Sequence, residues 1–323
     1  MADVLVVDLL GGLGDLVMVL PAVHALAGRH GPVDVLTHAP GDALLAADPA
    51  VARVLRAGRG AERAAVEAAL DDGPGLVVST TGHSGIGAAI RARAPRSVTN
   101  LWRRPPPDQP VARRYVEILA SEGLVDGAYA PPSVHLTADE RAAGAAAVPG
   151  DAPVVLVPDA GMAVKVWPHW PALAAALARQ RGERPLVVGE GATTDGWRTR
   201  LARPLPPTDL RGLAAVFAAV ADRGGVVVGP DTGPLRVAGA VGARTVGLFG
   251  PTSAARYGLD PPAVDLQGLP GCPHRRPTAI TEQVCWWDAD CPLDPAGPAC
   301  LADLAPDAVL DAVLGAVVPA GAA

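Results

Sequence analysis

Short apolar runs alternate with longer segments of helical periodicity along almost the whole chain. In the first half, strands are predicted at residues 4–7, 33–37 and 76–80, and helices at residues 16–29, 42–47, 61–70 and 111–121. In the second half, strands are predicted at residues 154–157, 185–189, 226–229 and 245–249, and helices at residues 171–180, 213–221, 231–241 and 306–317. Alternation of this kind predicts an α/β protein whose parallel sheets carry helices on both faces.

Stretches rich in proline and glycine interrupt this pattern at three places. Residues 104–110 (RPPPDQP) predict a loop, because proline fixes φ and lacks the backbone donor. Breakers gather again at residues 130–133 and 148–153. We place the domain boundary in the latter stretch, which gives domains at residues 1–150 and 151–323. In two open α/β domains in tandem, ligands are expected at the carboxyl ends of the strands, across a shared crevice.

The composition narrows the class of protein. Half of the 323 residues are apolar but only 3% are aromatic, which suits buried parallel strands and alanine-rich helices. The formal net charge is −6 and no basic stripe with interleaved aromatic residues occurs, so nucleic acid is not an expected partner. No targeting segment and no uninterrupted apolar run of 18 residues is evident, so we expect a soluble cytoplasmic protein without an integral membrane segment.

The chain contains a single lysine, Lys165, whereas the other 26 basic residues are arginine. The ammonium group of lysine is compact and can direct three donors at a phosphate. Because Lys165 follows the strand predicted at residues 154–157, it is a candidate phosphate ligand. A surface lysine without a special function is the alternative reading.

The first predicted strand leads into the glycine-rich turn Leu10–Leu16 (LGGLGDL). This turn lacks the third glycine of a dinucleotide fingerprint, and no acid ends the second strand, which argues against a nicotinamide dehydrogenase. The turn does direct Asp15 towards the expected crevice, where a carboxylate could accept a proton from a substrate hydroxyl. Asp15 could instead only cap the following helix. Gly12, Leu13 and Gly14 are candidate acceptor-binding residues.

A second polar turn, residues 231–234 (DTGP), joins a predicted strand to a predicted helix. Proline suits the first helical turn, and Asp or Thr suits the cap. The amides of Thr232 and Gly233, together with the helix dipole, would form an anion site, although an ordinary capped helix has the same signature. If the Lys165 loop converges on this turn, an ammonium and several amides could stabilise a departing nucleoside diphosphate without a metal. A single D-T-G also argues against an aspartic protease, which needs two such carboxylates.

Four cysteines lie in the C-terminal region, separated by 12, 5 and 8 residues: Cys272, Cys285, Cys291 and Cys300. In a cytoplasmic protein they should be reduced or metal-bound. Their clustering suggests Zn²⁺ or an iron–sulfur cluster, whereas the absence of a C-x-x-C spacing leaves four small buried residues as the alternative. Among the histidines, His83 follows the strand at 76–80 and is a candidate acceptor contact or a polar turn residue, and His24 and His30 are interpreted as helix-face residues.

Four short motifs occur in order along residues 11–256. They are Gly14–Val17 with Leu20–Ala22, Lys165–Pro168, Asp231–Gly233 and Gly247–Thr252. Together they resemble the ADP-heptose:lipopolysaccharide heptosyltransferases of glycosyltransferase family 9, and the cysteine-bearing tail is also similar to that of some members. At Arg236 the chain differs from the family, which commonly has a histidine there.

The resemblance implies a GT-B fold with two Rossmann-like domains, the N-terminal one for the acceptor and the C-terminal one for the nucleotide sugar. It also implies an inverting transfer that needs no metal or other cofactor. Asp15 would be the catalytic base, and Arg236 could replace the usual histidine in a bidentate phosphate contact. The donor-binding set would be Lys165, Asp231, Thr232, Gly233 and Arg236.

We therefore expect a glycosyltransferase that moves a sugar, heptose from ADP-heptose in the first place, to a hydroxyl acceptor. The acceptor candidates are a secondary metabolite, an envelope or cell-wall glycan and a lipid-linked precursor, and another nucleoside diphosphate sugar is the alternative donor. A nucleotide-sugar epimerase of the same fold and a non-catalytic nucleotide- or cluster-binding module are the other functions that these residues allow.

Overall fold

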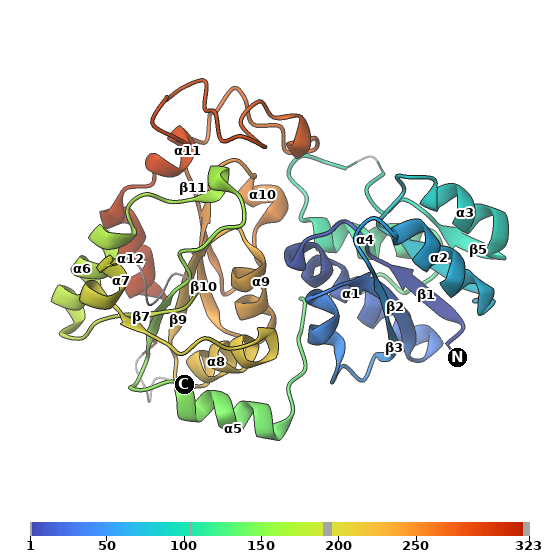
Figure 1. The fold of residues 1–323 in the computed structure, drawn as a ribbon, viewed down its shortest axis with the longest axis horizontal. Coiled ribbons are helices and arrows are strands. Elements are labelled where there is room, and N and C mark those ends of the chain that lie inside the picture. Colours follow the sequence, from blue (N-terminus) through green and yellow to red (C-terminus); the bar gives the residue numbers. More distant parts are fainter. Residues whose placement is uncertain (1, 104, 190–195, 319–323) are drawn as a thin grey trace. The chain divides into compact units, whose positions relative to one another are not determined.

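The computed structural model describes residues 2–103, 105–189 and 196–318, and the chain divides into two compact units, Met1–Thr137 and Ala138–Ala323 (Figure 1). The first unit contains β1 (Val4–Val7), α1 (Leu13–His30), β2 (Val33–His38), η1 (Gly41–Leu45), β3 (Val51–Ala57), α2 (Glu62–Asp71), β4 (Leu76–Ser79), α3 (Ile86–Arg93), β5 (Arg96–Val98) and α4 (Val111–Ser121). The second unit contains α5 (Ala138–Ala147), β6 (Val154–Leu156), η2 (Ala163–Lys165), α6 (Trp170–Arg181), β7 (Leu186–Val187), α7 (Gly196–Leu201), β8 (Arg203–Pro204), α8 (Leu210–Asp222), β9 (Val226–Pro230), α9 (Gly233–Ala240), β10 (Arg244–Phe249), α10 (Ala254–Tyr257), β11 (Val264–Gln267), η4 (Ile280–Glu282), α11 (Ala299–Ala302) and α12 (Pro306–Ala316).

The sheet of the first unit is parallel, with the strand order β3-β2-β1-β4-β5. The central strands β1 and β4 are buried along their whole length, as continuous apolar runs in a helix-covered parallel sheet should be. Because side chains alternate between the two faces of a strand, Leu5 and Val7 lie on one face, where they form a core with Val66 of α2 and Ile86 of α3. The adjacency of β1 and β4 brings the loops that follow them together at the carboxyl edge of this sheet.

The sheet of the second unit is also parallel, with the strand order β11-β10-β9-β6-β7-β8. Its core includes Trp167 and Trp170, whose rings meet edge-on with their centroids 4.9 Å apart. The indole Nε1 of Trp167 donates a hydrogen bond of 3.0 Å to the carbonyl oxygen of Leu304, which ties the chain before α6 to the segment before α12. Because β6 and β9 are neighbours, the loops that carry Lys165 and Thr232 leave the same edge of the sheet.

Helix α5 belongs to the second unit, so the observed division falls between Thr137 and Ala138 and not between residues 150 and 151, where the sequence predicts it. The reason is the close packing of α5 on α8. A Cβ atom added at Gly144 of α5 would lie 2.2 Å from the carbonyl oxygen of Ala215, and Arg211 of α8 pairs with Glu140. The proline- and glycine-rich stretch at 148–153 is therefore a turn inside the second unit.

Two further expectations from the sequence concern other parts of the chain. The loop expected at residues 190–194 lies outside the described residues. None of the described helices combines the length and the apolarity that crossing a membrane would require.

Candidate active site

Lys165 and the turn before α9 meet in the second unit. The ammonium Nζ of Lys165 donates to the carbonyl oxygen of Asp231 at 2.8 Å and lies 3.2 Å from its carboxylate Oδ2. Lys165 ends the 3-10 turn η2, and Asp231 directly follows β9, so the neighbouring strands β6 and β9 position both residues. The two loops therefore converge, which the sequence leaves as a condition for a diphosphate site.

The turn after Asp231 forms the start of α9. Thr232 is the N-cap residue with extended backbone angles, and Gly233 and Pro234 occupy the first helical turn. The first amides of a helix have no intrahelical carbonyl partner, and the helix dipole places partial positive charge at this end. Because Thr232 and Gly233 are only partly buried, an anionic group can reach these amides.

Arg236 lies inside the protein, where it supports the turn. Its side chain is 8% exposed and its Nη2 donates to the Oδ1 of Asp231 at 2.6 Å and to the carbonyl oxygen of Tyr257. Burial alone would raise the pKa of Asp231, but the charges of Lys165 and Arg236 hold it well below its usual range. Asp231 is therefore a buried, ionised carboxylate between two cations, and Arg236 contacts it directly.

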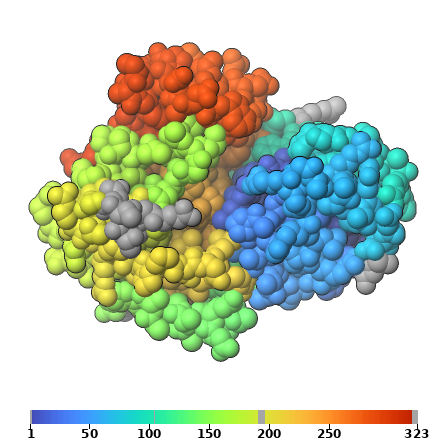
Figure 2. Space-filling view, viewed as in Figure 1, coloured from blue at the N-terminus to red at the C-terminus, as the bar shows by residue number. Residues whose placement is uncertain are grey.

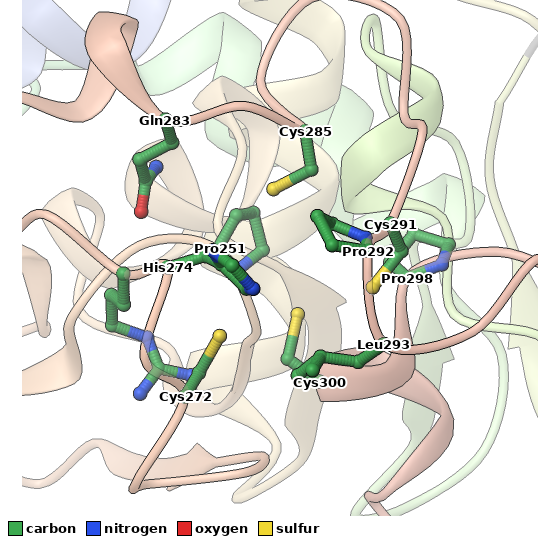
Figure 3. Close-up of a pocket in the computed structure, with 11 residues that line it drawn as sticks. Pro251, Cys272, His274, Gln283, Cys285, Cys291, Pro292, Leu293, Pro298 and Cys300 are labelled. Atoms are coloured by element: carbon green, nitrogen blue, oxygen red, sulfur yellow. The ribbon is translucent and has the colours of Figure 1, made fainter.

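The cysteine-bearing segment of the second unit forms a lobe, coloured orange-red in Figure 2, that reaches Lys165. The ammonium of Lys165 lies 5.4 Å from the centroid of the Trp286 ring, within the range of a cation–π contact. The residue next to this tryptophan, Cys285, faces the interior of the lobe (Figure 3). The lobe therefore supplies an aromatic wall beside the lysine.

The four cysteines line one pocket, and their sulfur atoms surround the same space (Figure 3). Burial raises the pKa of the Cys285 thiol, and it raises that of the Cys300 thiol to about 11. In the described structure none of these cysteines forms a disulfide and no three of the sulfur atoms lie within 4.8 Å of one another. A bound metal would therefore have to draw the lobe tighter and displace thiol protons.

In the first unit, the turn after β1 has the cap geometry that the sequence allowed for Asp15. Gly12 is the N-cap residue of α1, and its amide donates to the Oδ2 of Asp15 at 3.1 Å. A Cβ atom at Gly12 would lie 2.7 Å from the same oxygen, so only glycine fits without a shift. Leu13 and Gly14 form the first helical turn beside this partly buried carboxylate.

A residue that the sequence analysis missed, Asp8, directly follows β1 and lines one pocket with Gly12 and Leu13 of this turn. It is 2% exposed, and its Oδ1 accepts a hydrogen bond of 2.6 Å from the hydroxyl of Thr80 at the end of β4. Burial and the nearby charge of Asp15 raise its pKa from the ordinary 3.8 to about 7, although the Thr80 hydrogen bond acts in the other direction. The sequence signal was a lone acid at the end of an apolar strand, before a glycine-rich turn.

His83 lies in the loop that follows β4, at the same edge of the sheet as the Asp15 turn. Its side chain is exposed, and Nδ1 lies 3.1 Å from the hydroxyl of Ser84. The two loops are tied together, since the amide of Leu9 donates to the hydroxyl of Thr81 at 2.9 Å. The predicted acceptor residues of the first unit therefore come from adjoining loops.

Comparison with known proteins places this geometry in context. The family model described as glycosyltransferase family 9 (heptosyltransferase) matches residues 76–272, more than half of the chain. A glycosyl transferase family 9 structure from Veillonella parvula DSM 2008 is 15% identical with a TM-score of 0.74, covering 98% of each chain. The ADP-heptose lps heptosyltransferase II of Escherichia coli is 17% identical with a TM-score of 0.70, covering 97% of this chain and 98% of the other. The iron-containing dodecameric glycosyltransferase TibC of enterotoxigenic Escherichia coli is 14% identical with a TM-score of 0.63, covering 98% of this chain and 76% of the other. A search of curated protein sequences found no match.

Two open parallel sheets, each covered by helices, together with this structural likeness define a protein of the GT-B fold class. Within that class, the chain belongs to glycosyltransferase family 9, the heptosyltransferase family, and is a glycosyltransferase. The fold and family expected from the sequence motifs are thereby confirmed. The cytoplasmic location stays a prediction.

Proposed function

We propose that the protein transfers a sugar from a nucleoside diphosphate sugar, with ADP-heptose as the leading donor, to a hydroxyl group of an acceptor. The transfer inverts the anomeric centre and uses no metal ion at the reacting atoms. One observation carries this proposal: the only lysine of the chain lies 2.8 Å from the backbone at the N-terminus of α9. The ADP-heptose named for the structural relative from Escherichia coli supports the choice of donor.

The charges around Asp231 explain how this turn would hold a diphosphate. Lys165 and Arg236 carry two positive charges against one negative charge on Asp231, which leaves one positive charge in excess. The buried Asp231 carboxylate and Arg236 fix the turn, and the side chain of Lys165, 17% exposed, supplies the ammonium group. Charge that develops on the departing diphosphate would be stabilised by this ammonium and by the amides of Thr232 and Gly233.

In the first unit, Asp15 is the proposed catalytic base. It removes the proton from the acceptor hydroxyl as the oxygen attacks the anomeric carbon opposite the leaving diphosphate. The hydrogen bond from Gly12 fixes the carboxylate at the start of α1. Gly12, Leu13, Gly14 and His83 are the proposed acceptor contacts, and the first unit is the proposed acceptor domain.

Donor binding tests the assignment of Lys165. Lys165→Ala should weaken the binding of ADP about 10- to 100-fold, because one charge-assisted hydrogen bond contributes about 1.5–3 kcal/mol. Arg179→Ala is the matched control, since this exposed residue near the end of α6 removes one positive charge elsewhere in the same unit. Isothermal titration should show a changed dissociation constant only for the first variant, and equal dissociation constants would rule out the phosphate contact.

Turnover tests the assignment of Asp15. Asp15→Asn should lower kcat by about 10²- to 10⁴-fold while the dissociation constant for ADP stays unchanged. A parallel loss of donor binding would contradict the role as base.

Incubation of the donor without acceptor, followed by mass spectrometry and NMR, distinguishes transfer from epimerisation, because only an epimerase returns an isomerised nucleotide sugar.

We further propose that Cys272, Cys285, Cys291 and Cys300 hold a structural metal, Zn²⁺ or an iron–sulfur cluster. Support comes from the shared pocket and from the iron in the relative TibC. Protein purified without oxygen should then contain stoichiometric metal, and Cys272→Ser should lose it.

Added Mg²⁺ should leave the transfer rate of this protein unchanged, whereas activation by Mg²⁺ would contradict the metal-free transfer step.

A further inference from the structure

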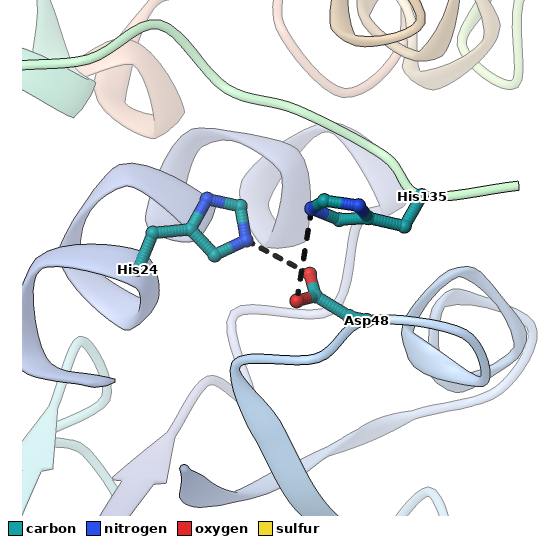
Figure 4. Close-up of side chains that lie close together, drawn as sticks. All are labelled: His24, Asp48 and His135. Carbon is teal, nitrogen blue, oxygen red and sulfur yellow. Dashed lines mark hydrogen bonds and ion pairs between the residues drawn. The ribbon is translucent and has the colours of Figure 1, made fainter. Parts of the chain in front are cut away.

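A second group of ligand-type side chains lies in the first unit, away from the Asp15 turn. His24 is on α1, Asp48 lies between η1 and β3, and His135 lies in the segment after α4 (Figure 4). One nitrogen from each imidazole and one carboxylate oxygen lie within 4.8 Å of one another. In the part of the chain that the structure describes, this is the group of three ligand atoms that meets this limit.

Of the two contacts that join Asp48 to these histidines, one has the length of a hydrogen bond and the other is too long for one. The Nε2 of His24 lies 2.8 Å from the Oδ2 of Asp48, an ordinary hydrogen-bond length. The Nε2 of His135 lies 4.0 Å from the Oδ1 of Asp48, which is too long for a direct hydrogen bond. Two ligands of one tetrahedral Zn²⁺ ion with bonds of about 2.0–2.1 Å are separated by roughly 3.3 Å, between these two values.

The surroundings make Asp48 a preorganised ligand. Its side chain is 2% exposed, and its Oδ1 also accepts a hydrogen bond of 2.9 Å from the amide of Ala50. The two histidines approach the carboxylate from different segments with their rings edge-on and their centroids 6.0 Å apart (Figure 4). A carboxylate fixed by the backbone needs little reorganisation to bind a cation.

The site is open to solvent on the side of the histidines. The side chain of His135 is 44% exposed and that of His24 is 20% exposed. His24 also lines a surface pocket with Arg29 and Asp126. Two imidazoles and one carboxylate with an accessible remaining position form the donor set that zinc sites with a bound water use.

We propose that His24, Asp48 and His135 bind one divalent transition metal ion, Zn²⁺ by the chemistry of the ligands. The ion would cross-link α1, the connection between η1 and β3, and the segment that ends the first unit at Thr137. This site is separate in sequence and in ligand type from the four cysteines of the second unit. It does not depend on the proposed sugar transfer.

Zinc titration of the full-length protein tests the site. His135→Gln should weaken Zn²⁺ binding by at least about 100-fold at one site, since loss of an outer-shell partner alone costs 10- to 100-fold. His30→Gln on the same helix is the matched control and should bind Zn²⁺ as the wild type does. The cysteines are present in all three proteins, so the difference in bound ions reports only the histidine site.

A second measurement identifies the ligands. Co²⁺ bound at this site should give an absorption spectrum without thiolate charge-transfer bands, and the difference spectrum between wild type and His135→Gln should isolate it. His24→Gln should lose the same part of the Co²⁺ spectrum that His135→Gln loses. If His24→Gln fails to fold, the exposed His135 position still tests the proposal. Equal stoichiometry and equal dissociation constants for wild type and His135→Gln would overturn the proposal.

Discussion

Replacing Asp8 with asparagine should stabilise the first unit at neutral and alkaline pH. The carboxyl group is 2% exposed, and its pKa is raised to about 7, mainly by burial and secondly by the charge of Asp15. The folded protein therefore binds a proton at Asp8 that the unfolded chain releases near pH 4. Asparagine resembles the protonated acid, and its amide oxygen can keep the hydrogen bond from Thr80.

The magnitude follows from the two pKa values. A pKa raised from 3.8 to about 7 corresponds to ~4 kcal/mol at ~1.4 kcal/mol per pKa unit. Because the folded-state pKa is the higher one, stability falls as the pH rises from the unfolded value to the folded value, and the loss is complete above it. The advantage of Asp8→Asn should thus grow from about 1 kcal/mol near pH 4.5 to about 4 kcal/mol near pH 8.

Hydrogen exchange followed by mass spectrometry can measure this difference in the first unit alone. The amides of β1 and β4 report its opening free energy, and the comparison of variant and wild type at one pH removes the intrinsic exchange rate. Asp108→Asn, which changes an exposed acid of the same unit, is the control and should have no pH-dependent effect. A difference between Asp8→Asn and wild type that stays constant from pH 4.5 to pH 8 would refute the assignment of a buried carboxyl group with a raised pKa.

Two further predictions concern the second unit. Gly144→Ala should destabilise the protein by about 1–3 kcal/mol, because the new Cβ atom would lie 2.2 Å from the carbonyl oxygen of Ala215. The comparison is Gly28→Ala in α1 of the first unit, where nothing lies within 4 Å of the new Cβ and the change should stabilise the protein by about 0.5–1 kcal/mol. Equal effects of the two changes in urea denaturation would contradict the close α5–α8 contact. Arg236→Ala should cost about 3–5 kcal/mol in the same assay, because it leaves the buried Asp231 with one cation fewer, and an unchanged midpoint would contradict the ion cluster.

The central strands and the long helices could be predicted from the sequence. The helix predicted at residues 111–121 matches α4, and the apolar run at 226–229 lies within β9. The sequence pattern does not predict β3, an edge strand in which half-buried residues alternate with the exposed residues Ala52, Val54 and Arg56. The helix predicted at residues 42–47 is the 3-10 helix η1, Gly41–Leu45. Over so short a stretch, sequence periodicity does not distinguish a 3-10 helix from an α-helix.

The sequence shows that Lys165 and Asp231 both follow predicted strands in the same half of the chain, but it leaves open whether their loops meet, because the adjacency of β6 and β9 appears only in the fold. The burial of Arg236 could not be predicted from the sequence either. Arg236 reaches Asp231 from the first turns of α9, and no strand pattern indicates that contact. The group formed by His24, Asp48 and His135 was equally hidden. Its members come from three segments that only the tertiary fold brings together, and the sequence interprets His24 as an ordinary helix-face residue.

The scarcity of lysine makes the donor region chemically addressable. Amine-reactive reagents meet one side-chain amine in this chain, and it is the partly exposed Lys165. Apart from the terminal amine, acylation or reductive alkylation would therefore label one residue, Lys165. A ligand bound at the N-terminus of α9 would slow the labelling of Lys165. The labelling rate would therefore report how much of the protein carries bound ligand, without any engineered probe.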